Sequence, residues 1–109
     1  MSILYKNAKV DLTTTNATAV LTPANATTAV IKSILVSEDS GNADTITLTI
    51  TDTASAVFSL FKVKAVGANT TVELLTAPLV LAESEILKAT AATANRLHIV
   101  VSYMEISYN

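Results

Sequence analysis

Histidine is the residue type that most often acts as a general base or a metal ligand, and His98 is the single histidine of the chain. A zinc or copper site would need further nitrogen or sulfur ligands, but the chain has no cysteine. A nucleophilic serine, threonine or lysine would need an activating neighbour, and no motif in the sequence supplies one. We therefore expect no enzyme activity, no catalytic residue and no metal, and we interpret His98 as an ordinary strand residue.

Segment 38–44 brings together three carboxylates, those of Glu38, Asp39 and Asp44, around Gly41. Carboxylate oxygens are ligands that calcium prefers. The segment lacks the alternating ligand spacing of an EF-hand and the bidentate glutamate at its end. Its other residues are turn formers, so we interpret 38–44 as a hairpin loop and leave calcium binding there as an open alternative.

Two further patterns resemble functional motifs. Glu83 and Glu85 flank a serine, but paired catalytic acids need surroundings that drive their pKa values apart, and we expect both side chains to face water. Three N-glycosylation patterns begin at Asn16, Asn25 and Asn69. In a chain so rich in threonine and asparagine we interpret these as chance matches.

The composition argues against several classes of partner. Charged residues make up 15% of the chain and the net charge is −2, so no basic stripe is present for nucleic acid. The longest apolar run, 77–82, is far shorter than the roughly 20 residues that span a bilayer. The first residues lack the pattern of a signal peptide, so we expect none. We expect no cofactor, no nucleic acid and no membrane partner.

The clearest periodicity in the chain is two residues long. Segment 45–51, TITLTIT, alternates threonine with isoleucine or leucine without interruption. Such alternation is typical of a strand with one buried face, because successive side chains point to opposite sides. Segment 28–37 is rich in β-branched residues, and the turn formers of 38–44 separate it from 45–51. We expect a hairpin whose threonines face water.

Short apolar segments and turns also make up the rest of the chain. Pro78 lacks an amide hydrogen, so a strand beside it belongs at a sheet edge or begins there. Segment 82–94 is rich in helix formers and could form a helix, but its shortness and the turns around it favour a strand. The further expected strands are 3–12, 18–21, 56–66, 71–75, 79–81, 86–91 and 96–107. Together they predict an all-β fold: a single antiparallel β-sandwich, or jelly-roll-like domain, of about eight short strands over residues 1–109.

Two of the expected strands, 28–37 and 96–107, carry apolar side chains on both faces. Strict alternation places Ile31 and Leu35 on one face of 28–37 and Val30, Ile34 and Val36 on the other. A sheet with one face in water should be polar at alternate positions, so we expect neighbouring subunits to cover the second face. The alternative is a closed barrel-like core or a folded-over terminus. The candidate interface residues are Val30, Ile31, Leu35, His98, Val100, Met104 and Ile106.

The chain resembles the small all-β virion structural proteins of tailed bacteriophages. The segments that carry the resemblance are LTPAN (21–25) before TTAVIKSI (27–34), ANTTVELL (68–75) before PLVL (78–81), EILKA (85–89) and VVSYMEI (100–106). The resemblance implies a structural component of the virion, assembled in the host cytoplasm. It implies a homo-oligomer, with a trimer favoured, that contacts the major capsid protein or other virion proteins. It implies no catalytic residues.

Within this class we expect a capsid decoration (cement) protein that binds the outer shell and stabilises it. The alternative is a domain of a tail fibre or of a head or tail appendage that recognises a glycan on the host surface. A third possibility, a small-ligand-binding sandwich, would need a lined pocket. The low charge content fits the first role, because charged residues are depleted at interface cores. Residues 1–12 are the best candidates for an N-terminal arm or edge strand that contacts another subunit by strand addition.

Overall fold

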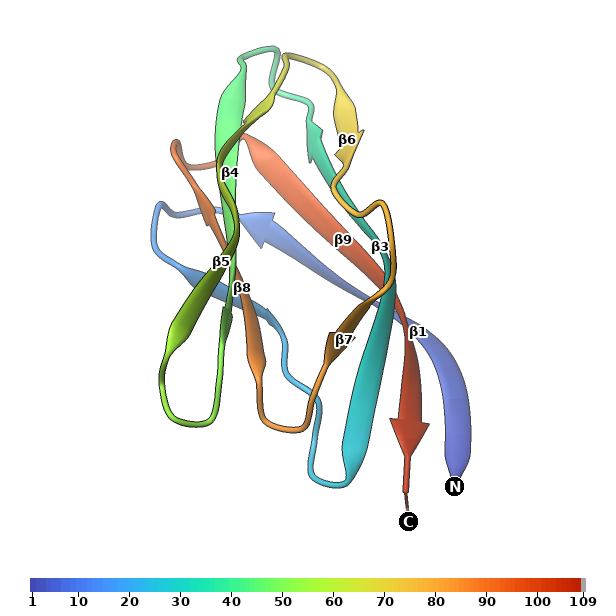
Figure 1. The fold of residues 1–109 in the computed structure, drawn as a ribbon. Coiled ribbons are helices and arrows are strands. Elements are labelled where there is room, and N and C mark those ends of the chain that lie inside the picture. The colour runs from blue at the N-terminus through green and yellow to red at the C-terminus, as the bar shows by residue number, and fades with distance from the viewer. Residues whose placement is uncertain (109) are drawn as a thin grey trace.

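The computed structural model describes residues 1–108, and these form two antiparallel β-sheets packed face to face (Figure 1). The first sheet contains five strands and the second contains four. The prediction of an all-β sandwich is therefore confirmed. The strands are β1 (Ser2–Leu12), β2 (Thr18–Leu21), β3 (Thr27–Glu38), β4 (Asp44–Thr51), β5 (Val57–Val66), β6 (Thr71–Glu73), β7 (Leu79–Leu81), β8 (Ile86–Ala91) and β9 (Leu97–Ser107).

The strand order is that of a jelly roll. In the first sheet the order is β1-β9-β3, and β3 then pairs with β6 along residues 35–37 and with β7 along residues 29–31. In the second sheet the order is β2-β8-β4-β5. Because β6 and β7 occupy one position beside β3, they act as a single strand interrupted at 74–78. When β6 and β7 are counted as one strand, each sheet has four strands, and their order matches that of a jelly roll.

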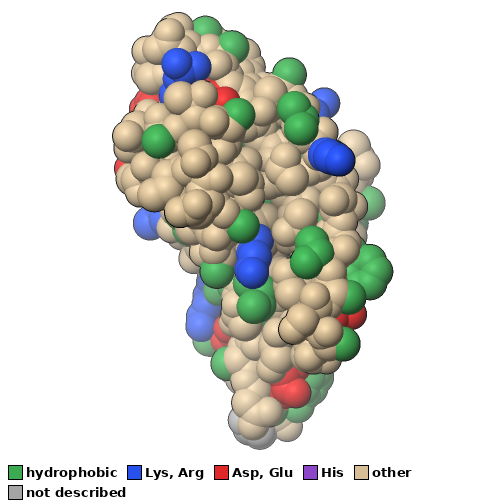
Figure 2. Space-filling model, turned by 90° about the vertical axis from the view of Figure 1, so that its left-hand side faces the viewer, with side chains coloured by type: hydrophobic (Ala, Val, Ile, Leu, Met, Phe, Trp, Pro, Cys, Tyr) green, Lys and Arg blue, Asp and Glu red, His purple; other side chains and the backbone are tan. Residues whose placement is uncertain are grey.

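Alternation along β4 produces one buried and one outward face, as the sequence predicts. Ile46 and Leu48 are fully buried between the sheets, whereas the alternating Thr45, Thr47 and Thr49 are half-buried and point outward. Figure 2 shows the molecule from the side on which the second sheet lies in Figure 1. That surface is mostly uncharged polar side chains and backbone, with hydrophobic side chains scattered over it. The second sheet therefore keeps a polar face toward water.

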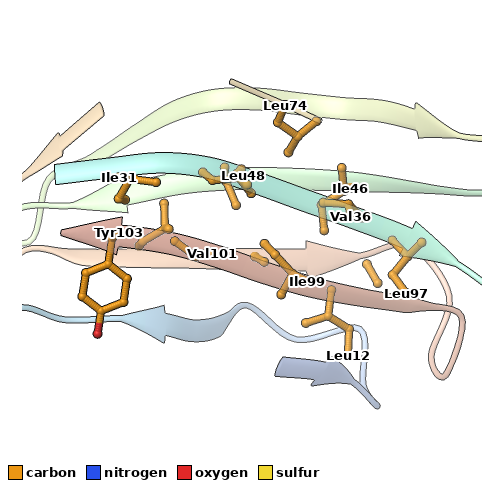
Figure 3. Packing of buried hydrophobic residues seen from close by; sticks show 14 of the residues in the cluster. Leu12, Ile31, Val36, Ile46, Leu48, Leu74, Leu97, Ile99, Val101 and Tyr103 are labelled. Carbon is orange, nitrogen blue, oxygen red and sulfur yellow. The ribbon is translucent and has the colours of Figure 1, made fainter. Parts of the chain in front are cut away.

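The core lies between the two inner faces. Figure 3 shows Ile31 and Val36 of β3 beside Ile99 and Val101 of β9 in the buried cluster. Each of these four side chains is fully buried, and Leu48 of β4 belongs to the same cluster. Burying a side chain of this size contributes about 1.5–3 kcal/mol, so this cluster is the main favourable term that holds the sheets together.

A β-bulge in β3 corrects one of the sequence predictions. The register between β3 and β9 shifts between Ile31 and Ser33, because an extra residue on β3 is accommodated there. The side chains of Ile31 and Ile34 therefore point into the core, although strict alternation places them on opposite faces. Ile31 is a core residue and not an interface residue. Val30 and Leu35 share the outer face.

The alternative of a helix over 82–94 is wrong. Residues 86–91 form β8, which pairs with β2 on one side and β4 on the other. Turns close both ends of this strand, and Ser84 and Asn95 adopt positive φ angles of 66° and 65° in them. Local helix propensity is weak compared with the hydrogen bonds that two neighbouring strands supply.

The molecule is elongated, with extents of 45 × 27 × 23 Å. Figure 1 shows β1 and β9 running to the two chain ends at the same end of the first sheet. Residues 2–7 of β1 are exposed, whereas Ala8 and Val10 are half-buried and Leu12 is buried. Within residues 1–108, no helix is long and apolar enough to cross a membrane.

Candidate functional site

The outer face of the first sheet carries a row of apolar side chains that the pairing of four strands brings together. Tyr5 of β1 lies opposite Met104 of β9, which lies opposite Val30 of β3, which lies opposite Val80 of β7. Side chains of directly paired residues point to the same face of a sheet, so these four form one line across it. Four segments far apart in sequence therefore meet on one surface.

Two further rows belong to this surface, one next to the central row and one beyond the polar pair of Asn7 and Ser102. Ile3 lies opposite Ile106 near the chain ends, and Val100 lies opposite Leu35 toward the other end of the sheet. We call this set the outer patch. It consists of Ile3, Tyr5, Val30, Leu35, Val80, Val100, Met104 and Ile106.

The outer patch is accessible to solvent in the isolated chain. Tyr5 is 80% exposed, Val80 58% and Leu35 38%. β9 has 11 residues, so four strand positions of this length cover about 36 × 19 Å, or roughly 700 Å². Stable protein interfaces bury about 800 Å² on each partner. The outer face of the first sheet is therefore about as large as one side of a standard interface.

The outer face is also hollowed along the boundary between β1 and β9. One hollow of about 270 Å³ is lined by Lys9, Asp11, His98 and Val100. A second hollow, of about 370 Å³, is lined on this face by Tyr5, Asn7, Lys32 and Ser102. A polar row of Asn7, Ser102 and Ser33, with Lys32 beside it, therefore separates the apolar row of Met104 from that of Val100.

The structure places most of the predicted interface residues on this face. Val30, Leu35, His98, Val100, Met104 and Ile106 lie on it, and Ile31 does not. Three members of the outer patch are not among the individually named candidates: Val80, and Ile3 and Tyr5, which lie in the segment 1–12 predicted as an arm or edge strand. Alternation in 3–12 groups Ile3 with Tyr5, but it cannot show that β1 pairs with β9. Val80 was missed because a three-residue strand after Pro78 carries almost no periodicity.

His98 lies at the end of the outer face farther from the chain termini, between two carboxylates. Its Nε2 atom is 3.3 Å from Oδ1 of Asp11, and its Nδ1 atom is 3.8 Å from Oδ2 of Asp39. In a catalytic triad, one ring nitrogen must face the nucleophile. Here both nitrogens face carboxylates, so the geometry does not provide a nucleophile–base pair.

The carboxylate of Glu38 is the most constrained polar group of the fold. The residue is 1% exposed, and its carboxylate accepts hydrogen bonds from the backbone N–H groups of Ser40 (2.8 Å), Gly41 (3.1 Å) and Asn69 (3.1 Å). It also accepts one from the Ser40 hydroxyl. That hydroxyl bond, together with the three backbone bonds, outweighs the opposing effect of burial and lowers the pKa of Glu38 to about 2.

These contacts bear directly on the calcium alternative for 38–44. The oxygens of Glu38 are taken by N–H and O–H donors, and Oδ2 of Asp44 accepts the N–H of Thr93 at 3.1 Å. Asp39 lies beside His98. The three carboxylates therefore serve different partners. Within residues 1–108, no group of three or more acidic, histidine or cysteine side chains could hold a metal ion.

Glu83 and Glu85 each serve the backbone of a turn. Glu83 accepts the N–H of Ala26, and Oε1 of Glu85 accepts the N–H of Ala82 at 2.8 Å. The N–H of Ser84 donates to the carbonyl of Pro23 at 3.0 Å. Glu83 therefore fixes this turn against the loop before β3, Glu85 closes its own turn, and the two do not form a pair of acids around a common substrate position.

The outer patch is therefore our candidate for a surface that contacts another molecule. The sites suggested by His98, by the 38–44 loop and by the two glutamates are explained by contacts within the fold. Comparison with known proteins adds no family to this picture: no protein-family model, no curated protein and no solved structure matches the chain.

Proposed function

We propose that the protein is a structural component of a bacteriophage particle, a capsid decoration (cement) protein that binds the outer shell as a homo-oligomer and stabilises it. The observation that carries the proposal is the outer patch, which in an isolated chain leaves large apolar side chains in water. Burying each of them at an interface is worth about 1.5–3 kcal/mol at most. The resemblance to small virion proteins supplies the identity of the particle.

The distribution of charge supports an interface on this face. The central row of the outer patch consists of Tyr5, Met104, Val30 and Val80, and none of these side chains carries a charge at neutral pH. A partner can therefore cover this row without removing a charge from water, which would be costly, provided that Lys32 in the neighbouring hollow stays solvated. The jelly-roll fold is compatible with the role but does not by itself support it, because this fold also serves lectins.

A second candidate function is supported by the hollow that Tyr5, Asn7, Lys32 and Ser102 line. An aromatic ring beside amide, hydroxyl and ammonium groups can bind a sugar through stacking and hydrogen bonds. In that case the protein would be a domain of a tail fibre or of a head or tail appendage that recognises a host-surface glycan. The breadth of the outer patch beyond this hollow favours the decoration role.

Binding to shells that lack the protein tests the proposal. Shells assembled from the major capsid protein of the encoding phage should bind the purified chain saturably, and their melting temperature should rise, because a ligand of the native state stabilises it by mass action. Met104→Lys puts a charge at the centre of the outer patch and should weaken binding at least tenfold, since one buried, unpaired charge costs several kcal/mol.

Thr90→Lys is the matched control. Thr90 is half-buried on the outward face of β8 in the second sheet, so the variant carries the same added charge away from the outer patch. It should bind shells as the parent protein does. Binding of the parent protein to host cells but not to shells would overturn the decoration role in favour of glycan recognition. Equal losses in the two variants would show that the outer patch is not the contact.

A further inference from the structure

Each sheet of a sandwich has two edge strands, and an open edge offers unpaired N–H and C=O groups to any extended chain. The edges of this fold are β1 and the β6/β7 pair in the first sheet, and β2 and β5 in the second. Natural sheets protect their edges with short strands, bulges, prolines and lysines. The four edges can therefore be compared for such protection.

Three of the edges are protected. β6 and β7 are three residues long and are separated by a segment that contains Pro78. β2 has four residues and a register shift against β8. β5 has two register shifts against β4, and Val63 within it has a φ of 54°, a conformation that a β-branched residue rarely adopts. None of these three presents a long, regular row of backbone groups.

β1 differs from all of them. It has 11 residues and pairs with β9 in one unbroken register, from Ser2 opposite Ser107 to Leu12 opposite Leu97. It contains no proline and no glycine. Within residues 1–108, the backbone hydrogen bonds of β1 outside its ladder with β9 are confined to Asp11 and Leu12, whose carbonyls accept the N–H groups of Thr13 and Asn95 at 3.0 Å. The free edge from Ser2 to Val10 is long and regular, and of the protective features named above it carries only lysines, Lys6 and Lys9.

We propose that β1 pairs antiparallel with β1 of a second copy of the chain across a two-fold axis, which joins the two first sheets into one continuous sheet. The axis of such a pair is perpendicular to the sheet, so residues that face each other come from the same face. The inference rests on the proposed self-association, but it assigns the contact between copies to this edge and leaves the outer patch to other partners.

The sequence of β1 complements itself when the axis passes through Asn7, the middle residue of the strand. In this register residues 4–10 of the free edge pair with one another, and Leu4, which is 50% exposed, lies opposite Val10. Tyr5 lies opposite Lys9, an arrangement that allows a cation–π contact. Axes through Lys6 or Lys9 would place two lysines directly opposite each other, which is unfavourable.

A cysteine scan tests this register, because the parent chain contains no cysteine. Directly opposed residues have Cβ atoms about 4.5–5.5 Å apart, so Asn7→Cys should be cross-linked between copies by a short bismaleimide. Ile3→Cys lies eight residues from its symmetry mate, about 26 Å at 3.3 Å per residue, and should not cross-link with itself. A mixture of Ile3→Cys and Asp11→Cys should cross-link. Val57→Cys is the control. Val57 is exposed on β5, an edge strand that is interrupted by register shifts, and its cysteine variant should not cross-link.

The measured mass of the full chain complements the scan. Light scattering should give a dimer or an even multiple of the 11.4 kDa chain, since a two-fold contact joins copies in pairs. Asn7→Lys places two like charges at the axis and should raise the dissociation constant about 2- to 5-fold. Ser102→Lys adds the same charge one strand further in, on the same face, and should leave it unchanged.

A monomer at all concentrations, or stronger cross-linking at residue 57 than at residue 7, would overturn the inference. So would equal effects of Asn7→Lys and Ser102→Lys. These failures are distinct from failure of the proposed function. A trimer that binds shells without a cross-link at residue 7 would leave the decoration role standing and remove the β1 pairing. A dimer that is cross-linked at residue 7 but does not bind shells would support the β1 pairing and overturn the decoration role.

Discussion

At the scale of single residues, the carboxylate of Glu38 joins two loops that are distant in sequence. It accepts N–H groups from its own loop, at Ser40 and Gly41, and from Asn69, 31 residues away. The backbone N–H of Glu38 in turn donates to the carbonyl of Thr70 at 2.9 Å. A single buried side chain thus fixes the β3–β4 loop against the β5–β6 loop.

The lowered pKa of Glu38 predicts how stability depends on pH. The carboxyl group titrates near 4.5 in the unfolded chain and at about 2 in the folded protein, so folding favours its charged form. Its contribution is complete above about pH 4.5 and is lost as the pH falls toward 2. Urea titrations should show the free energy of unfolding decreasing over this range. In Glu38→Gln the decrease should be smaller and the protein should already be less stable at pH 7.

Glu105→Gln provides the comparison for this prediction. Oε1 of Glu105 pairs with Nζ of Lys6 at 3.0 Å, and water reaches this pair because the lysine side chain is 44% exposed. Exposed ion pairs contribute little to stability, because water screens them and side-chain entropy opposes them. Glu105→Gln should therefore lower the urea midpoint at pH 7 less than Glu38→Gln does. An equal or larger loss in Glu105→Gln would contradict the importance assigned to Glu38.

At the scale of elements, the bulge in β3 decides which side chains reach the core. The Glu73 carboxylate stabilises it by accepting the N–H of Ile34 at 2.8 Å and the hydroxyl of Ser33. Burial by itself would raise the pKa of Glu73, but these hydrogen bonds, with those from the backbone of Leu74 and Leu75, hold the pKa below its ordinary value. The bulge at Ser33 and Ile34 is therefore held in place by Glu73 of β6.

Alanine substitutions on either side of the bulge should differ strongly in cost. Ile31→Ala removes a fully buried side chain and should lower the free energy of unfolding by about 2–5 kcal/mol. Val30→Ala removes a half-buried side chain from the outer face and should cost about 1 kcal/mol or less. Chemical denaturation of the two variants measures both values. If Val30→Ala were the more damaging, the face assignment of β3 would be wrong.

At the scale of the whole molecule, the jelly-roll order gives some strands two hydrogen-bonded neighbours and others only one. β3 and β9 are long and have partners on both sides, whereas β6 and β7 are short edge segments. Opening an edge breaks few contacts, but exposing a central strand requires nearly global unfolding.

Hydrogen exchange should reveal this difference. The amides of Val36 and Val101, in the middle of the first sheet, should exchange only at a rate set by the global free energy of unfolding. The amides of β6 and β7 should exchange through local opening and so at least tenfold faster. Residue-resolved exchange measured by NMR provides the comparison. Uniform protection across the first sheet would contradict the interpretation of β6 and β7 as weakly held edges.

Much of the fold could be predicted from the sequence, because strand formation with a buried face leaves a local signature. The alternation of 45–51 specified β4 and its polar face, and turn formers marked the ends of the strands on either side of 38–44. The seven apolar residues of 96–107 indicated that both faces of β9 carry apolar side chains. These features depend on side chains one or two residues apart, where the pleat of the backbone alone determines direction.

Only the tertiary structure decided which surfaces came together. The bulge at Ile31–Ser33 depends on Glu73, the environment of Glu38 depends on Asn69, and the outer patch depends on the pairing of β1 with β9 and of β7 with β3. Each of these contacts joins residues more than 30 positions apart, which periodicity along one strand cannot encode. The sequence by itself therefore determined that the chain is an all-β sandwich with surplus apolar residues. The register between strands determined where those residues are exposed.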